Sequence, residues 1–410
     1  MVERGHYHSF WRFSLLAIVG GHILTITKGE IEKGTLLIDE GKIVAVGREV
    51  AVPAGASIID ATGKYVLPGL IDAHTHVGIG EEAQGWAGMD VNEMTDPVTA
   101  HLRAIDAINP EDEGFRDALR GGVTAIQINP GSANIIGGLT VAMKTFGRTV
   151  DEMALRSPSG LKAALGENPK RVYGDQKKLP STRMGSAAVL REWLVKAQNY
   201  MAKEEAAKQE PGKPFERDLR LEAIARVLRR EIPLRLHAHR ADDIMTALRI
   251  QEEFGFDLTL EHCTEGHKIA DVIAKRGIPA MVGPTITART KVELRDRSLR
   301  TPALLSQAGV KVCIITDHWI VPIQHLIVSV ILAVREGMAP EEALKAVTIN
   351  PAEVIGVADR IGSLEPGKDA DFQIMSGHPL DIMSRAEKVF VSGQLAYDWA
   401  TERERMGPGS

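Results

Sequence analysis

The amino-terminal part of the chain alternates short apolar runs with glycine-containing turns. Residues 23–27, 34–38 and 42–46 are rich in Ile, Val, Leu and Thr, and glycines separate them. Short β-branched runs bounded by such turns are typical of strands. Residues 15–66 are therefore predicted to form a β-rich region, with residues 1–14 as a leader outside the fold.

After residue 76 the pattern changes to helical stretches that alternate with β-branched runs. Residues 186–203 and 219–230 read as helices, and each precedes a predicted strand. Strands are predicted at residues 65–71, 124–128, 161–165, 234–237, 257–262, 278–282 and 310–317, and residues 140–143 could add one more. This alternation predicts β-α units around a parallel sheet, as in a (β/α)8 barrel.

The carboxyl-terminal part returns to the first pattern. Residues 341–355 read as a helix, and a second β-rich region follows from residue 361 to residue 391. The charged stretch 203–213 is predicted to be a solvated helix end followed by a loop.

The composition sets limits on the function. The chain has 410 residues, of which 44% are hydrophobic and 25% charged, with a net charge of −5. This balance is ordinary for a globular protein and argues against a nucleic-acid-binding surface. No apolar run reaches the roughly 18–20 residues that span a bilayer, so no membrane partner is expected. The two cysteines, Cys263 and Cys313, cannot form a disulfide framework and fit a reducing, cytoplasmic setting.

Candidate metal ligands gather at the ends of predicted strands. His74 and His76 follow the first apolar strand and, two residues apart, point to the same side of it. His237, His262 and Asp317 end three later strands. In a (β/α)8 barrel the carboxyl ends of all strands open onto one face, where catalytic residues gather. Four imidazoles and a carboxylate there predict a site for one or two divalent metals, which lower the pKa of bound water.

Two positions stay open in this ligand set. His237 directly follows its strand and is preferred as a ligand over His239, which is expected to face the substrate or to support the ligands. A bridge between two metals could come from a carboxylated Lys162 or from Glu167. Their odd spacing keeps a regular strand from aiming both inward, and Glu167 is preferred because it needs no modification.

One motif competes with the metal site. Residues 78–83 (GIGEEA) match the G-x-G-x-x-A fingerprint of dinucleotide-binding folds. However, Glu81 and Glu82 would repel a pyrophosphate at a helix N-terminus. The preceding strand also carries ligand-type side chains, so a dinucleotide site is not expected. The chain also lacks the Gly-x-Ser-x-Gly elbow of serine hydrolases.

These motifs resemble those of the amidohydrolase superfamily, in particular the metal-dependent hydrolases grouped with imidazolonepropionase, enamidase and Xaa-Pro dipeptidases. The matching pieces are residues 41–47 (GKIVAVG), 67–76 (LPGLIDAHTH), 237–239 (HAH), 261–262 (EH), 316–317 (TD) and 362–371 (GSLEPGKDAD). The resemblance implies an α/β fold: a distorted (β/α)8 TIM barrel at residues 69–360, with a small β-sandwich domain formed from residues 15–68 and 361–400. The metal ligands that it implies are His74, His76, His237, His262 and Asp317, with Lys162 or Glu167 as the bridge.

The expected function is hydrolysis of a C–N bond in an amide, a cyclic amide or a dipeptide-like small molecule. Zinc is the expected metal, with iron or manganese as alternatives, and family habit suggests a homo-oligomer. Asp317 would carry the proton from the activated water to the leaving nitrogen, and His239 with Arg240 would meet a substrate carboxylate. Two alternatives stay open: a heterocycle deaminase of the same superfamily, and a catalytically silent relative that serves as a scaffold.

Overall fold

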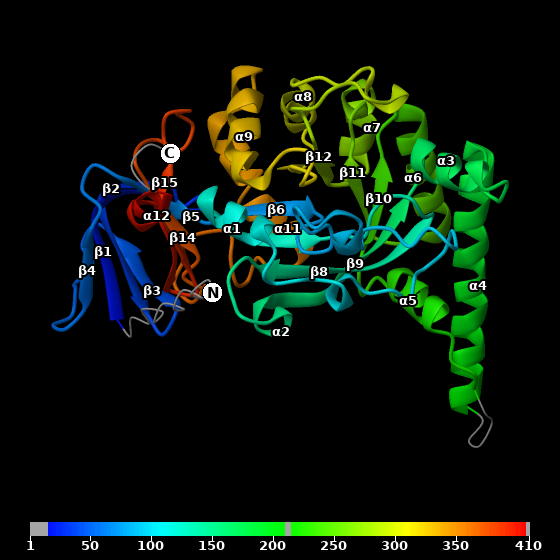
Figure 1. The fold of residues 1–410 in the computed structure, drawn as a ribbon, viewed down its shortest axis with the longest axis horizontal. Helices are drawn as coiled ribbons and strands as arrows, with labels where there is room; N and C mark the ends of the chain where they lie inside the picture. The colour runs from blue at the N-terminus through cyan, green and yellow to red at the C-terminus, as the bar shows by residue number, and fades with distance from the viewer. Residues whose placement is uncertain (1–14, 210–214, 407–410) are drawn as a thin grey trace, which may run out of the picture.

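The structure is a computed structural model that describes residues 15–209 and 215–406. The predicted leader, residues 1–14, lies outside the described residues. Two eight-stranded sheets organise the chain (Figure 1). One curves into a barrel whose outside is covered by helices, and the other forms a smaller domain at one end of the barrel. The predicted fold class, a distorted barrel with a sandwich domain made from both chain ends, is confirmed.

The smaller sheet joins segments from the two ends of the chain. Its strands are β1 (Leu15–Leu24), β2 (Glu30–Asp39), β3 (Lys42–Gly47), β4 (Ser57–Asp60), β5 (Tyr65–Pro68), β14 (Phe372–Met375), β15 (Ala386–Val391) and β16 (Gln394–Asp398). They follow the order β16-β15-β14-β5-β1-β2-β3, with β4 also paired to β1. The two ends meet where β14 runs antiparallel to β5, with Phe372 opposite Pro68. Phe372 and Phe390 stack at 4.5 Å in the core of this domain.

The barrel sheet follows the chain order from β6 to β13. Its strands are β6 (Leu70–Thr75), β7 (Val123–Ile128), β8 (Ile136–Lys144), β9 (Ala154–Ala164), β10 (Leu234–Ala238), β11 (Leu258–His262), β12 (Ala280–Val282) and β13 (Val312–Ile314). Its first and last strands are joined by side-chain bonds, because the carboxylate of Asp72 accepts hydrogen bonds from Thr316 Oγ1 at 2.6 Å and Thr316 N at 3.0 Å. These bonds fix the position of the residue that follows, Asp317.

One strand departs from the parallel pattern of a (β/α)8 barrel. The prediction of a strand at residues 140–143 is confirmed by β8, but β8 runs antiparallel to both β7 and β9. A parallel neighbour needs a crossover of about a dozen residues or more, and the short segment 129–135 between β7 and β8 does not provide it. The carboxyl end of β8, Lys144, therefore lies at the end of the barrel that faces the smaller domain.

Several predicted strands have wrong bounds. The strands predicted at 278–282 and 310–317 are shorter, as β12 and β13, and the one at 161–165 is longer, as β9. Two further cases have a clear physical reason. Residues 65–71 are not one strand: β5 ends at Pro68 in the smaller sheet, and β6 begins at Leu70 in the barrel. Gly69 lies between them, where an added Cβ would come within 2.0 Å of Thr124 Oγ1, so the chain can pass only without a side chain. The strand predicted at residues 23–27 overlaps only the end of β1, which stops at Leu24. The backbone turns shortly afterwards, at Ile26, where φ is 75°.

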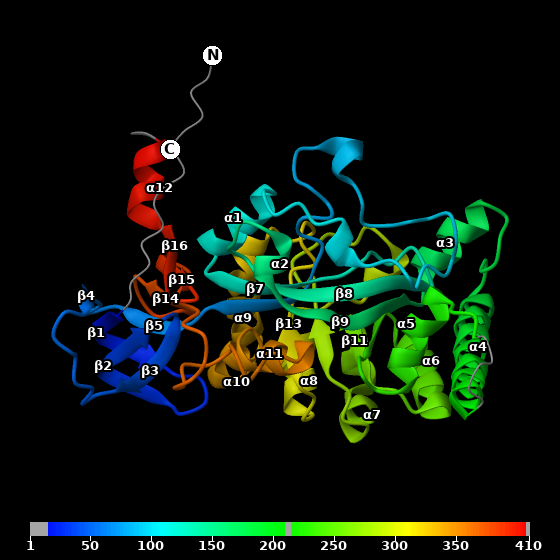
Figure 2. The same cartoon turned by 90° about the horizontal axis from the view of Figure 1, so that it is seen from below.

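Helices surround the barrel, and the longest stands at its outer edge (Figure 2). They are α1 (Glu113–Arg120), α2 (Val150–Met153), α3 (Glu167–Asp175), α4 (Arg183–Gln209), α5 (Leu219–Leu228), α6 (Ala241–Phe254), α7 (Ala270–Lys275), α8 (Thr301–Gln307), α9 (Leu326–Arg335), α10 (Pro340–Lys345) and α11 (Ile349–Ile355). A further helix, α12 (Trp399–Met406), packs instead against β15 and β16 of the smaller domain. The predicted helices at 186–203 and 219–230 correspond to α4 and α5, whereas 341–355 is divided into α10 and α11. None of the helices in residues 15–209 and 215–406 has the length and apolarity of a bilayer-spanning segment.

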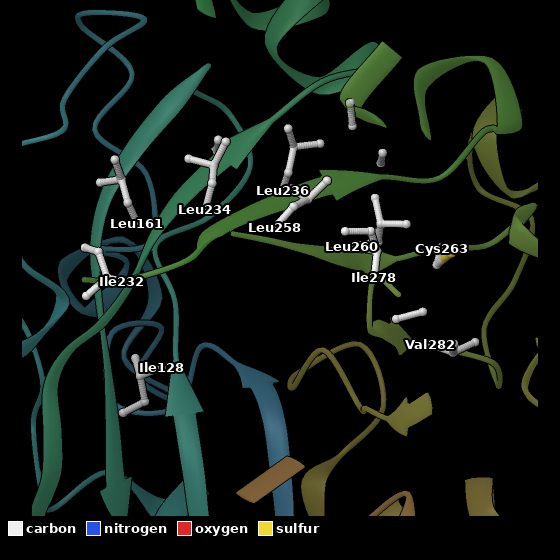
Figure 3. Close-up of a cluster of buried hydrophobic side chains, with 14 of the residues drawn as sticks. Ile128, Leu161, Ile232, Leu234, Leu236, Leu258, Leu260, Cys263, Ile278 and Val282 are labelled. Atoms are coloured by element: carbon white, nitrogen blue, oxygen red, sulfur yellow. The ribbon is translucent and has the colours of Figure 1, made fainter. Parts of the chain in front are cut away.

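The main hydrophobic core lies between the barrel strands and these helices. Figure 3 shows leucines of neighbouring strands in this layer, among them Leu161, Leu234, Leu236, Leu258 and Leu260. Side chains alternate along a strand, so the residues between these leucines face the inside of the barrel. Those inward residues are polar and buried, and they lead up to the carboxyl ends of the strands.

Candidate metal centre

A cavity of about 230 Å³ opens at the carboxyl ends of the barrel strands. Its walls include His76, Lys162, His237, His262 and Asp317, which come from five different strands or their ends. Two overlapping sets of side chains could each hold a metal ion, because within each set the candidate ligand atoms lie within 4.8 Å of one another. One set is His74, His262 and Asp317, and the other is His237, His239 and His262. The structure thus brings together residues that are as far apart in the sequence as His74 and Asp317, as the barrel geometry predicts.

The two histidines of the first strand are anchored through the same ring nitrogen. His74 Nδ1 contacts Glu261 Oε2 at 2.6 Å, and His76 Nδ1 donates to the carbonyl oxygen of Asn129 at 2.7 Å. Their Nε2 atoms are 3.5 and 3.4 Å from Asp317 Oδ1. A metal-binding histidine commonly uses one ring nitrogen for such an anchor and presents the other to the ion.

His237 is buried, and its two ring nitrogens have no hydrogen-bond partner within the described residues. Burying an unpaired polar group is unfavourable by about 1–3 kcal/mol. The neighbouring His262 ring lies 4.4 Å away, centroid to centroid, with its Nδ1 donating to the Gly283 carbonyl at 2.9 Å. This donor set fits a divalent cation, and the two free nitrogens of His237 are the clearest sign of it.

The charges of the site favour the forms that bind metal. Burial lowers the pKa of His74 to about 4 and that of His262 to about 3, so both rings are neutral at pH 7. Burial and the adjacent His262 also hold the pKa of His237 well below its usual value. Burial alone would raise the pKa of Asp317, but His262, His76 and His74 outweigh it and keep that pKa well below its usual range. Neutral imidazoles and an ionised carboxylate are the ligand forms of these groups.

The two candidates for the bridge lie in different places. Lys162 is 1% exposed, and its Nζ is 3.2 Å from His74 Nε2, inside the cluster. Burial lowers the pKa of Lys162 to about 8. Glu167 instead begins α3, where its carboxylate accepts from the backbone N–H of Glu293 at 3.3 Å and its own N–H donates to Glu293 Oε1 at 2.6 Å. The structure therefore brings Lys162, and not Glu167, among the histidines.

Of the two residues predicted to contact the substrate, His239 lies at the cavity and Arg240 does not. His239 lines the cavity, with Nδ1 2.7 Å from Thr264 Oγ1 and Nε2 3.2 Å from Lys291 Nζ. Both of its nitrogens are thus engaged, in contrast to those of His237. Arg240 points elsewhere and forms a bidentate pair with Asp242 at 2.8 and 2.9 Å.

Three supporting residues were not singled out from the sequence. Glu261 anchors His74, Asn129 anchors His76, and Lys291 contacts His239. Glu261 directly precedes the ligand-type His262, so its place in the motif was a usable signal. Asn129 acts through its backbone and Lys291 lies in a loop, so neither carries a pattern that sequence reasoning could use. The G-x-G-x-x-A segment, residues 78–83, forms turns, and no α-helix follows it directly.

Comparison with known proteins agrees with this geometry. The profile of the Amidohydrolase family matches residues 65–396. The chain is 27% identical to the imidazolonepropionase of Mesorhizobium japonicum, over 93% of this chain and 94% of that protein. It is also 27% identical to amidohydrolase tasK of Hapsidospora irregularis over 89% of this chain, although it spans only 40% of the length of tasK.

Solved structures show the same fold. An amidohydrolase from Thermotoga maritima superposes with a TM-score of 0.91 at 46% identity, covering 93% of this chain and all of that one. A Xaa-Pro dipeptidase with bound methionine shares the fold at 17% identity and a TM-score of 0.59, covering 94% of this chain and 100% of that one. The chain belongs to the amidohydrolase family and is a hydrolase that acts on carbon–nitrogen bonds.

Proposed function

We propose that this enzyme hydrolyses an amide bond of a small molecule, a cyclic amide or a dipeptide-like compound, with a divalent metal, most simply zinc. The residues that would hold the metal are His74, His76, His237, His262 and Asp317. The observation that carries the proposal is the pair of unpartnered nitrogens of buried His237, next to His262 and in the same cavity as Asp317. A buried imidazole with two free nitrogens is unfavourable unless an ion or a ligand completes it.

We assign the bridging position to Lys162 rather than to Glu167. The amine of Lys162 lies in contact with His74, whereas the carboxylate of Glu167 is bonded to the backbone of Glu293. A lysine amine becomes a ligand of the required charge when it is carboxylated. Glu167 would need no modification, but its contacts with Glu293 argue against it as the bridge.

Asp317 is the proton carrier in this proposal. A divalent cation at such a site lowers the pKa of water towards about 7 and polarises a carbonyl group. The Asp317 carboxylate is 16% exposed, borders the cavity and is ionised, so it can take the proton of the attacking water. It then gives the proton to the leaving nitrogen. Its backbone is set by the bonds between Thr316 and Asp72, which keep the carboxylate at the cavity.

The substrate class is supported by the relatives and by the shape of the site. The names of two similar proteins, an imidazolonepropionase and a Xaa-Pro dipeptidase, point to a cyclic substrate and to a dipeptide substrate. The cavity of about 230 Å³ suits a small substrate of either type. An adenine deaminase of Moorella thermoacetica is also similar, at 25% identity over 92% of this chain and 56% of that protein, so ammonia release is measured as a separate outcome.

The test is a hydrolysis screen with zinc-reconstituted protein over N-acyl amino acids, Xaa-Pro dipeptides and cyclic amides, with ammonia assayed in parallel. The Asp317→Asn variant should lose about 10²–10⁴-fold in kcat on any substrate found. Activity that survives this substitution, or ammonia as the sole new product, would contradict the proposal. Metal content measured for both proteins separates loss of proton transfer from loss of metal.

A further inference from the structure

A second lysine borders the same cavity from a loop. Lys291 lies between β12 and α8, and its side chain is 23% exposed. Its Nζ is 3.2 Å from His239 Nε2 and 3.3 Å from Glu293 Oε2. An ammonium group carries three donors. The contact with His239 is a hydrogen bond and the contact with Glu293 is an ion pair, so at least one donor remains for a further acceptor.

Glu293 holds this ammonium in place. Its side chain is fully buried, and its Oε1 accepts the backbone N–H of Glu167 at 2.6 Å. Its other oxygen, Oε2, is the one that faces Lys291. Because this carboxylate is fixed by a backbone bond, the positive charge of Lys291 is kept at the cavity wall instead of extending into solvent.

Other cations near the cavity are turned away from it. Arg240 forms its bidentate pair with Asp242, and Arg183 donates from Nε to both oxygens of Asp243 at 3.0 and 3.1 Å. Among the described residues that line the cavity, Lys162 and Lys291 bear the cationic chains, and Lys162 lies against His74. Lys291 is therefore the cation placed to meet a substrate.

The same cavity has an apolar wall. Val91, Leu294, Trp319 and Ile320 line it, and Trp319 and Ile320 are 40% and 47% exposed. Apolar side chains that line a cavity and remain accessible gain free energy when a ligand covers them. A ligand that matches both features has a carboxylate and an apolar group.

We propose that Lys291 binds the carboxylate of the substrate while the apolar wall takes its side chain, so that the preferred substrates are N-acyl derivatives of apolar amino acids. This inference rests on the proposed amide hydrolysis and names its substrate class. Water cleaves the C–N bond: the acyl carbon gains the hydroxyl group and leaves as a carboxylic acid, and the nitrogen of the amino acid gains the proton and leaves as an amine. The released amino acid keeps the carboxylate held by Lys291.

The test uses a matched pair, N-acetyl-L-leucine and N-acetyl-L-leucinamide. The first carries the carboxylate that Lys291 would bind, and the second carries a neutral amide in its place. With zinc-reconstituted protein we expect kcat/KM for the acid to exceed that for the amide at least tenfold, measured at the acetyl bond. Lys291→Met should remove this preference, mainly through KM, and Lys291→Arg should retain most of it. The control is Lys268→Met, a lysine paired with Glu265 and Asp296 that does not line the cavity.

Binding of the same two compounds, measured by calorimetry, separates this inference from the proposed function. If neither compound is hydrolysed but the wild type binds the acid more tightly and Lys291→Met does not, the reaction is wrong and the carboxylate site stands. If hydrolysis occurs and Lys291→Met, shown to be folded by its thermal unfolding, keeps the wild-type preference, the inference is overturned. Loss of the preference in Arg240→Met instead of Lys291→Met would overturn it as well.

Discussion

Two lysines on neighbouring barrel strands are both buried and yet have opposite surroundings. Lys144, on β8, contacts Asp369 Oδ2 at 2.8 Å, Asp371 Oδ1 at 2.9 Å and Ser392 Oγ at 2.6 Å. Lys162, on β9, is in hydrogen-bond contact with His74 Nε2 alone, at 3.2 Å, within the described residues. The first ammonium has an oxygen partner for each of its three donors, and the second lies among imidazoles.

Lys144 has the contacts of a charge that stabilises the fold, whereas Lys162 lies at the proposed reaction site. Lys144 ties the barrel to the smaller domain, because both aspartates come from the segment that leads into β14. Lys162 shares its end of the barrel with the unpartnered nitrogens of His237. Natural proteins tolerate such incomplete pairing at functional sites and compensate for it elsewhere. Four substitutions or conditions test this contrast.

The largest effect on stability is expected for Lys144→Met. This change leaves Asp369 and Asp371 buried without their common partner, and breaking a buried ion pair destabilises by about 3–5 kcal/mol. Denaturant unfolding measures the free energy of unfolding. The control is Lys64→Met, which breaks the more exposed pair with Glu387 and should change stability by about 1 kcal/mol or less. Equal losses in the two variants would refute the structural role of Lys144.

Zinc should stabilise the opposite end of the barrel. At a free concentration of one hundred times its Kd, a ligand that binds only the folded state adds about 2.7 kcal/mol to the free energy of unfolding. We expect this gain in the wild type and a clear reduction of it in His237→Ala. His378→Ala, an exposed histidine in the smaller domain, is the matched control and should keep the full gain. A gain of the same size in His237→Ala would show that zinc binds elsewhere.

Acid should weaken the ion pairs that Lys144 forms with Asp369 and Asp371. Burial alone would raise the pKa of Asp369, but Lys144, Lys42 and Arg360 outweigh it and lower this pKa from 3.8 to about 2. A lowered folded-state pKa means that the stabilisation is complete above about pH 4 and is lost as the pH falls towards 2. The loss is about 2 kcal/mol. It is measured as the difference in unfolding free energy between wild type and Asp369→Asn, which should shrink over this range and stay constant above pH 5.

The smallest change in stability is expected for Lys162→Met. Because the Lys162 ammonium has little hydrogen bonding to lose, metal-free protein should keep its free energy of unfolding within about 1 kcal/mol. Hydrolysis and bound zinc should fall in the same variant. A loss of stability as large as that of Lys144→Met would remove the distinction between the two lysines.

The residues that meet at the cavity could be predicted from the sequence better than the exact bounds and directions of the strands. Histidines and an aspartate at the ends of apolar runs are visible in the sequence, and the barrel brings strand ends together whatever the exact bounds of the strands. His237 was preferred to His239 from its place after the strand, and its unpartnered nitrogens agree with that preference. The metal-binding roles themselves stay predictions until an ion is measured.

Other features depended on contacts that have no local signature. The apolar run through residues 65–71 reads as one strand, and only the approach of Thr124 to Gly69 shows why it is divided. The reversed direction of β8 follows from the short connection between β7 and β8. The surrounding segment is rich in glycine and has no clear hydrophobic period, so the sequence did not indicate this direction. The choice between Lys162 and Glu167, and the presence of Lys291 at the cavity, required side chains that are distant in sequence to be placed together.

The pairing of β14 with β5 has a consequence for the order in which the molecule is assembled. Strand β5 leaves the ribosome early, but its partner follows roughly 300 residues later, which at 5–20 residues per second is a delay of roughly 15–60 s. During that interval the edge of β5 has no neighbour on that side. We expect the barrel segments to fold first, because the smaller domain is complete only when the last part of the chain has been synthesised.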